Sequence, residues 1–439
     1  MNQLRPRGPR ASARRAALGI TAALLGAAAL TACGGDSGGD SGGTTIKIWA
    51  SVDQPIIDGF QQHLDAAAKE AGLTIKFEKV ENINQLIMTK LQAGDQPDIA
   101  LIPQPGVVGD IVDLGAAYPL DDVVDTAALG ETMIPGTLDV GTFDDKLYGL
   151  LVQMNVKSLV FYNKPAFEKA GYQAPKTLDE LLALTDQIKA DGGTPWCMGL
   201  ESDTATGWPA TDWFEDLVMR YGGVDGYNQW VSHEIPFDSD LVRQAAATFE
   251  KIMFTDGNVL GGRKAIASTG FANAGYPMFD PGGPSCWLFK QGSFIPNFIV
   301  EGAGTTLDDI GAFGFPPLEE GGDNPTLGGG DLAVLLDDSD NAKTVMKMLA
   351  DPDLGLEAAP ISSFISPHKN FDTSLYPDAL TAQMAQVAYD STAFLFDGSD
   401  QMPGEVGAGS FWREMTAWVS EQEDLDTALT NIDASWPAG

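Results

Sequence analysis

Beyond residue 43 the chain alternates between short strand-like and longer helix-like patterns of apolar residues. Residues 45–49 alternate polar and apolar side chains, as a half-buried strand does. Residues 56–71 place apolar side chains at helical spacing and are followed by a glycine that ends the predicted helix. Residues 74–77 and 99–102 are further predicted strands, and residues 83–93 are a further predicted helix. Strands that alternate with helices of this length predict a parallel α/β sheet.

A second series of the same kind begins after Asn155. Residues 158–162 read as a strand, and residues 164–170 read as a helix that ends at a glycine. Thr177 and Glu180 form a capping box that opens a helix reaching about residue 190. Residues 196–200 are another predicted strand. The 439-residue length is enough for two or three domains, so the pattern predicts two α/β lobes.

The first 43 residues have the pattern of an export signal. All five arginines before residue 33 lie in the first 15 positions, and a short apolar run over residues 16–30 follows them. The segment Leu30-Thr31-Ala32-Cys33 resembles a bacterial lipobox, which implies that Cys33 receives a diacylglyceryl group. An unmodified cysteine beside an ordinary cleavage site is the alternative. We expect residues 1–32 to be a lipoprotein signal peptide and residues 33–43, rich in Gly and Ser, to be a flexible tether.

The charge balance is strongly acidic. The formal net charge is -35, and removal of the five leading arginines leaves 21 basic against 61 acidic residues. Such a chain repels nucleic acid, anionic lipid headgroups and phosphorylated ligands, so we expect no nucleic-acid partner. The same charge favours a neutral or cationic ligand, although it could equally serve solubility alone.

The motifs of common metal and nucleotide sites are missing from the sequence. None of the three histidines has metal-ligand spacing, and no P-loop or strand-linked G-x-G-x-x-G is present, so we expect no metal and no cofactor. The many carboxylates keep one enzyme class open, because a glycoside hydrolase needs only two of them across a sugar. A surface-anchored glycoside hydrolase is therefore the alternative function.

Two cysteines remain once Cys33 is assigned to the lipid. An exported chain meets oxidising conditions, so a disulfide between Cys197 and Cys286 is expected from the compartment. Two buried free thiols are the alternative.

Several segments together resemble one family, the sugar-type extracellular solute-binding proteins of ATP-binding-cassette importers. The resemblance is strongest to the subgroup associated with α-glucosides, and it spans nearly the whole chain after the tether. The segments are Pro97–Pro105, Phe161–Lys164, Thr194–Ser202, Gly207–Trp213, Phe396–Pro403 and Gly407–Trp412.

This resemblance implies a two-lobed periplasmic-binding-protein-like α/β fold with a hinge and an interlobe cleft. Residues 44–155 with about 305–362 would form the N-terminal lobe, and residues 156–304 with about 363–439 the C-terminal lobe. The crossings between lobes are expected near residues 153–156, 304–311 and 359–366. The implied protein is a monomer and no enzyme; it is lipid-anchored to the outer face of the cell membrane and delivers a sugar to the permease subunits of an importer.

A sugar site needs aromatic rings for C–H faces and carboxylates or amides for hydroxyl groups. Trp208 lies at a loop-to-helix entry and is the best aromatic candidate, with Glu201 and Asp212 flanking it as acceptors. Three further candidates follow predicted strands: Asp53, Gln54 and Gln104. Trp287 adjoins Cys286, and Asp331 follows a run of three glycines. The last two candidates, Asp400 and Trp412, rest on the family resemblance alone. The three that follow strands lie where ligands bind in open α/β sheets, although each could equally be a loop cap.

Overall fold

The computed structural model describes residues 44–437, all of which lie in one compact unit of the chain. Its larger sheet has the strand order β11-β10-β3-β1-β2, and β6 also pairs with β10. These strands are β1 (Thr44–Ala50), β2 (Leu73–Lys79), β3 (Ile99–Ile102), β6 (Gly149–Val156), β10 (Thr326–Leu335) and β11 (Phe394–Phe396). The predicted parallel arrangement holds for β1, β2 and β3, whereas β10 runs antiparallel to both β3 and β6.

Helices of the first lobe bury apolar stripes that the sequence pattern indicates. Helix α1 buries Ile57, Phe60, Leu64 and Ala68, the predicted stripe, and Gly94 ends α2 in the left-handed conformation. The helices are α1 (Gln54–Glu70), α2 (Ile83–Ala93), α3 (Pro105–Asp113), α4 (Thr126–Thr132) and α11 (Asp340–Leu349), and a small hairpin joins β4 (Thr142–Phe143) to β5 (Lys146–Leu147).

The second sheet is small and antiparallel, with the order β8-β7-β9. Its strands are β7 (Leu159–Asn163), β8 (Leu288–Gln291) and β9 (Ile310–Gly314). The strand predicted at residues 196–200 does not form, because Trp196 makes only single bridges, to Val259 and Leu288. The predicted disulfide between Cys197 and Cys286 is confirmed and ties this segment to the residue two before β8.

Most of the second lobe is helical. Helix α5 spans its predicted residues, and Thr177 caps α6 by accepting the N–H of Glu180 at 3.2 Å. The Glu180 carboxylate reaches back to the N–H of Lys176 rather than to that of Thr177. The helices are α5 (Lys164–Ala170), α6 (Leu178–Ala190), α7 (Trp208–Val231), α8 (Asp240–Met253), α9 (Arg263–Ile266), α10 (Ile295–Ala303), α12 (Ala379–Tyr389), α13 (Gly398–Gln401), α14 (Trp412–Val419) and α15 (Leu425–Ala434), with a π-helical turn over Glu405–Phe411.

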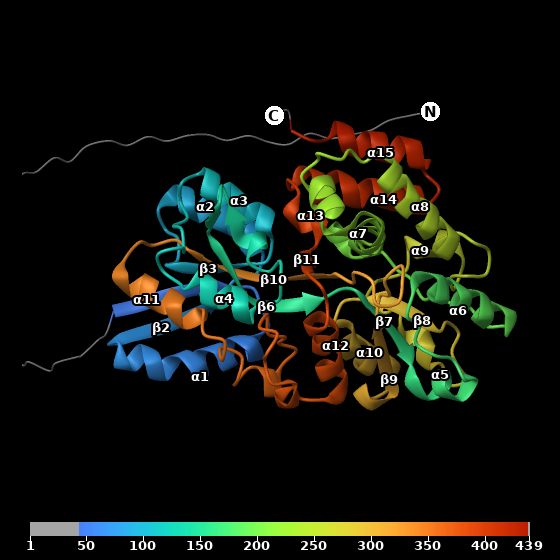
Figure 1. The fold of residues 1–439 in the computed structure, drawn as a ribbon, viewed down its shortest axis with the longest axis horizontal. Coiled ribbons are helices and arrows are strands. Elements are labelled where there is room, and N and C mark those ends of the chain that lie inside the picture. Colours follow the sequence, from blue (N-terminus) through green and yellow to red (C-terminus); the bar gives the residue numbers. More distant parts are fainter. Residues whose placement is uncertain (1–43, 438–439) are drawn as a thin grey trace, which may run out of the picture. The chain divides into compact units, whose positions relative to one another are not determined.

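Figure 1 shows β6 and β10 running across the middle of the molecule between the two lobes. The first crossing, from β6 to β7, lies next to its predicted place. The second does not: residues from about 305 were expected in the N-terminal lobe, but β9 pairs with β7, so the chain leaves the second sheet only after Gly314. Residues from 363 were expected in the C-terminal lobe, yet β11 pairs with β10 in the first sheet. Strands β9 and β11 are short and apolar, so their sequences do not show which sheet they join; this depends on the strands they pair with.

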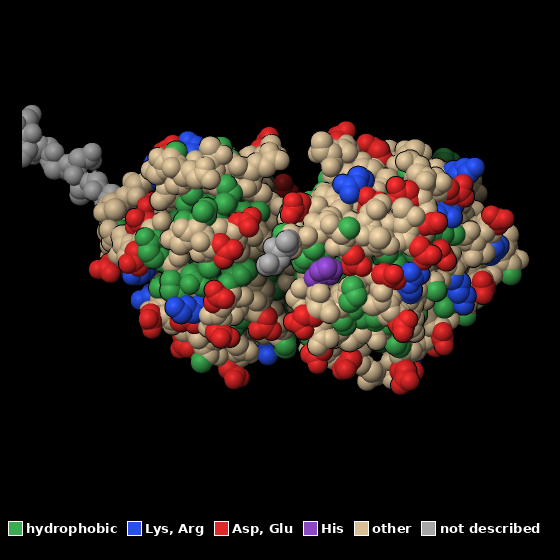
Figure 2. Space-filling view, turned by 90° about the horizontal axis from the view of Figure 1, so that it is seen from above, with side chains coloured by type: hydrophobic (Ala, Val, Ile, Leu, Met, Phe, Trp, Pro, Cys, Tyr) green, Lys and Arg blue, Asp and Glu red, His purple; other side chains and the backbone are tan. Residues whose placement is uncertain are grey.

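The surface of the described residues is acidic. Figure 2 shows Asp and Glu side chains spread over both lobes of one face, with Lys and Arg at fewer places. None of the helices in residues 44–437 combines the length and apolar character that a membrane crossing requires. Cys33 and the predicted signal and tether lie outside the described residues.

Candidate functional site

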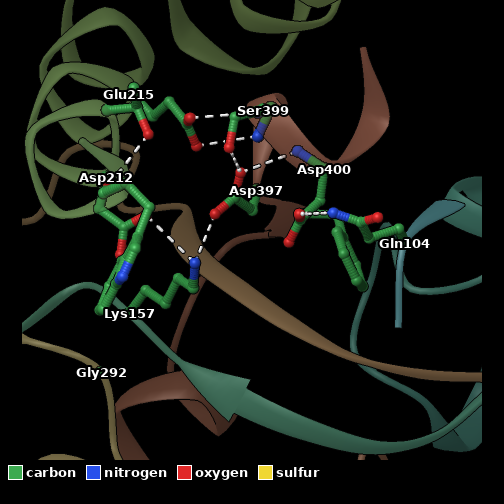
Figure 3. Close-up of polar contacts among 12 residues, drawn as sticks. Gln104, Lys157, Asp212, Glu215, Gly292, Asp397, Ser399 and Asp400 are labelled. Atoms are coloured by element: carbon green, nitrogen blue, oxygen red, sulfur yellow. Dashed lines mark hydrogen bonds and ion pairs between the residues drawn. The ribbon is translucent and has the colours of Figure 1, made fainter. Parts of the chain in front are cut away.

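A buried lysine at the first crossing holds together acids from two distant parts of the chain. Lys157 follows β6, and its Nζ lies 3.1 Å from the Asp212 carboxylate and also donates to Asp397 (Figure 3). The Lys157 side chain is only 12% exposed, and those of Asp212 and Asp397 are 5% and 2% exposed. Opposite charges this deeply buried are stable only as partners.

The two acids come from the starts of two helices. Asp212 lies in the first turns of α7, and Asp397 caps α13 by accepting the N–H of Asp400 at 3.0 Å. Helix α7 begins after Gly207, whose φ is +120°. A Cβ at Gly207 would lie 2.3 Å from the carbonyl oxygen of Trp412, so only glycine lets the start of α7 approach the start of α14 so closely.

A third acid, Glu215, lies nearly one turn after Asp212 on α7. Its carboxylate accepts the N–H groups of Gly398 at 2.8 Å and Ser399 at 3.2 Å, which ties α7 to α13 (Figure 3). Asp212, Glu215 and Asp397 can each bring one oxygen within 4.8 Å of the others, a spacing that suits a metal ion. Their oxygens already meet the Lys157 ammonium and backbone donors, so the geometry favours an ion-pair network over a metal site.

Burial and charge set the protonation of this network. Burial raises the pKa of Asp212 to about 7, against the opposing effect of Lys157. Burial also acts against the charged form of Lys157, but Asp212 and Asp397 outweigh it and raise its pKa well above the usual value. Burial acts on Asp397 in the same direction as on Asp212, yet Lys157 lowers the Asp397 pKa overall. Lys157 and Asp397 are therefore both charged at neutral pH.

The first lobe reaches this network through Gln104, which follows β3 and occupies the N-cap position of α3. Its Nε2 donates to the Asp400 carboxylate at 2.8 Å, and its Oε1 accepts from Asn84 at 2.8 Å. Burial, followed by the charge of Asp397, raises the pKa of Asp400 to about 7. Hydrogen bonds thus run from the first lobe into the acidic network of the second.

Aromatic side chains form a wall beside the network. The ring of Trp208, the first residue of α7, lies 5.0 Å from that of Phe271 and 6.0 Å from that of Phe294. Lys157 Nζ lies 5.3 Å from the Trp208 ring centroid. All three rings are partly exposed, so the wall presents an apolar face.

A cavity of about 470 Å³ reaches Ser293, the residue before Phe294. Ser293, one of its lining residues, accepts the N–H of Val156 at 3.1 Å and so connects the cavity to the end of β6. Asp53 and Gln54, at the start of α1, line the same cavity. The cavity therefore lies between residues of both lobes.

The structure brings most of the candidates to this region. Gln104, Asp212, Asp400 and Trp208 lie in or beside the network, and Asp53 and Gln54 line the adjoining cavity. Trp412 donates to Ser399 at 3.1 Å. Exposed Glu201 pairs through its backbone with Phe271, next to the aromatic wall.

Two candidates have side-chain partners outside this network. Trp287 packs against Tyr172, with ring centroids 5.1 Å apart, and next to Gly193, so its side chain fills a packing position of the second lobe. Asp331 is buried in β10, where it accepts from Gln153.

Sequence reasoning missed Lys157, Glu215, Asp397 and the phenylalanines of the wall. One signal was available for Asp397, because an Asp directly before Gly-Ser in a family-like segment is a strong N-cap. Lys157 sits at a predicted crossing, where a charged residue between two apolar strands stands out. The sequence near Lys157 and near Asp397 does not indicate which residue each one contacts.

Comparison with known proteins agrees with this architecture. The family described as bacterial extracellular solute-binding protein matches residues 53–354. The alpha-glucosides-binding periplasmic protein of Rhizobium meliloti is 36% identical over 91% of this chain and 88% of its own length. The osmoprotective compounds-binding protein of Synechocystis is 35% identical over 86% of this chain and 89% of its own length.

The apo form of RafE from Streptococcus pneumoniae has the same fold, with a TM-score of 0.72 at 18% identity over 91% of this chain and 98% of that protein. The predicted two-lobed α/β fold and the predicted family are thereby confirmed, and so is the expectation of a binding protein instead of an enzyme. The chain belongs to the bacterial extracellular solute-binding protein family.

Proposed function

We propose that this protein binds an α-glucoside or a similar neutral oligosaccharide in its interlobe cleft. One observation carries the proposal: the aromatic wall of Trp208, Phe271 and Phe294 lies beside Lys157 and its acidic network, which the partly buried amide of Gln104 joins through Asp400. A sugar offers apolar C–H faces and hydroxyl groups on one small ring, and this combination matches both features. The name of the Rhizobium relative supports the α-glucoside class.

The ligand-binding residues in this proposal come from both lobes. Asp53, Gln54 and Gln104 would contact the sugar from the first lobe, and Glu201, Trp208, Asp212, Asp400 and Trp412 from the second. The lobes would close by a hinge movement at β6 and β10, the strands that run between them. A sugar that binds the closed form more tightly than the open form would shift the population toward closure.

We infer that the closed form delivers its sugar to the permease subunits of an ATP-binding-cassette importer, as a monomer anchored to the membrane. Other relatives carry the name of extracellular-binding proteins of such transporters, which supports the partner. The lipobox-like segment that ends at Cys33 supports the anchor. An acidic surface disfavours binding to anionic lipid headgroups, so acyl chains at Cys33 would attach the protein to the membrane.

Isothermal titration calorimetry with maltose, trehalose and sucrose, followed by chromatography of the recovered sugars, tests the proposal. We expect saturable one-to-one binding of at least one of them and its recovery intact. A chain that binds none of a broader α-glucoside panel would contradict the ligand class. Cleaved sugar would instead point to the glycoside hydrolase alternative.

A further inference from the structure

One face of the hinge strand β10 is turned toward Lys157. Gly329 and Asp331 pair with Asn155 and Gln153 on the antiparallel neighbour β6. Directly paired residues, and residues two apart along a strand, point to the same side of a sheet. A Cβ on Gly329 would lie 3.9 Å from Lys157 Cε, so this side faces the lysine that carries the acidic network.

Asp331 offers a buried acceptor on that face. Gln153 Nε2 donates to its Oδ2, whereas its Oδ1 has no hydrogen-bond partner among the described residues. The residue is only 4% exposed. A buried carboxylate oxygen without a donor is costly, so such an atom in a binding protein indicates a donor that arrives with the ligand. A bulge between Asp331 and Leu332 breaks the register at this point, as bulges near binding sites often do.

Gly329 leaves an unfilled side-chain position two residues before Asp331, on the same face of β10. Of three consecutive glycines, Gly328 and Gly330 lie against their neighbours: an added Cβ would meet Phe394 at 2.3 Å or the carbonyl oxygen of Gln153 at 2.1 Å. Gly329 differs, because its Cβ would meet only Lys157 Cε within 4 Å. Gly329 also lacks the positive φ that would require glycine. The absence of a side chain at Gly329 therefore leaves space, although the backbone conformation there does not require glycine.

We propose that Gly329 and Asp331 form a subsite for one hydroxyl group of the bound sugar, on the floor of the cleft in β10. The hydroxyl lies over Gly329, beside the methylene stem of Lys157, and donates to Asp331 Oδ1. Gln153 holds the other carboxylate oxygen and so fixes the direction of the acceptor. This inference rests on the proposed sugar-binding function and adds a specific contact in the hinge. The contact would link sugar recognition to the strand that runs between the lobes.

Two variants and one control test the subsite by calorimetry with whichever of maltose, trehalose and sucrose binds the wild type. Gly329→Ala places a methyl group in the space, and Asp331→Asn replaces the acceptor by an isosteric amide. We expect each to weaken binding about tenfold, the scale of a lost hydrogen bond to a charged group. Gly130→Ala, on α4 with open space around it, should leave affinity unchanged.

Deoxy analogues of the same sugar identify the hydroxyl. Removal of one particular hydroxyl should weaken binding by the wild type about tenfold and binding by Asp331→Asn hardly at all. Wild-type affinity in both Gly329→Ala and Asp331→Asn would overturn the subsite while leaving sugar binding intact. A wild type that binds no sugar would instead overturn the proposed function. If Asp331→Asn shows no cooperative thermal transition and is therefore unfolded, the affinity of Gly329→Ala alone tests the subsite.

Discussion

At the scale of single residues, Lys157 is the buried partner of two carboxylates, those of Asp212 and Asp397, and the sequence around it does not indicate this role. Lys157→Met should lower the free energy of unfolding by about 3–5 kcal/mol, because Asp212 and Asp397 would lose their buried partner. Urea denaturation followed by tryptophan fluorescence measures this change. Lys176→Met is the matched control: Lys176 and Glu320 are both 65% exposed, so water screens their ion pair and the variant should lose far less stability. Equal losses in the two variants would contradict a buried network.

The burial of Asp331 should make the free energy of unfolding depend on pH. Burial raises its pKa from 3.8 to about 7, and the hydrogen bond from Gln153 opposes this only in part. Between these values the folded protein holds a proton that the unfolded chain has released, so the contribution of Asp331 to stability falls as the pH rises from 4 to 7. Asp331→Asn removes that dependence.

The stability of Asp331→Asn relative to wild type should therefore increase by about 2–4 kcal/mol between pH 4 and pH 8. Chemical denaturation at both pH values provides the measurement. A difference between the two proteins that stays constant with pH would show that Asp331 does not titrate in this range.

Trp208 and Trp287 separate a binding role from a packing role. Trp208→Ala should weaken α-glucoside binding about tenfold or more, because the aromatic wall loses its central ring. Its melting temperature should change little, since the ring is partly exposed. Trp287→Ala should leave the affinity for the α-glucoside unchanged, because that ring packs against Tyr172 and lies outside the aromatic wall. Intact affinity in Trp208→Ala, measured by calorimetry, would place the ligand elsewhere.

At the scale of elements, the start of α7 depends on one glycine. Gly207→Ala should destabilise the protein by about 2–4 kcal/mol and weaken sugar binding, because a methyl group would push against Trp412 and displace Trp208. Gly94→Ala is the control: Gly94 also has a positive φ, of 68°, but no atom lies within 4 Å of the added Cβ. Thermal melts should show a smaller loss there, of about 1 kcal/mol. Equal losses would mean that backbone strain, without the clash, accounts for Gly207.

The elements themselves were largely predictable from local patterns. Helix α5 and helix α6 match their predicted spans because capping residues and glycine stops lie within one turn of each end. The segment after Trp196 failed as a strand because an apolar run of that length does not determine its partners. It lies beside β8 and Val259 with single bridges only.

At the scale of the whole molecule, the predicted anchor has a direct test. Cys33→Ser should release the protein from the membrane fraction into the medium or the periplasm, because no acyl chains would be attached. Cell fractionation with an antibody against the chain measures the distribution, and mass spectrometry of the wild-type N-terminus should show a diacylglyceryl cysteine. A wild type with an unmodified mature N-terminus would contradict lipidation.

The sequence by itself determined the alternation of strands and helices, the family and the residue types of a sugar site, because these depend on neighbours a few positions apart. Only the tertiary structure decided which residues meet. Lys157 and Asp397 are 240 residues apart, and Gln104 and Asp400 are 296 apart. Strand β9 joined the second sheet through pairing with β7. Contacts over such separations follow from the packing of whole elements, and no local period records them.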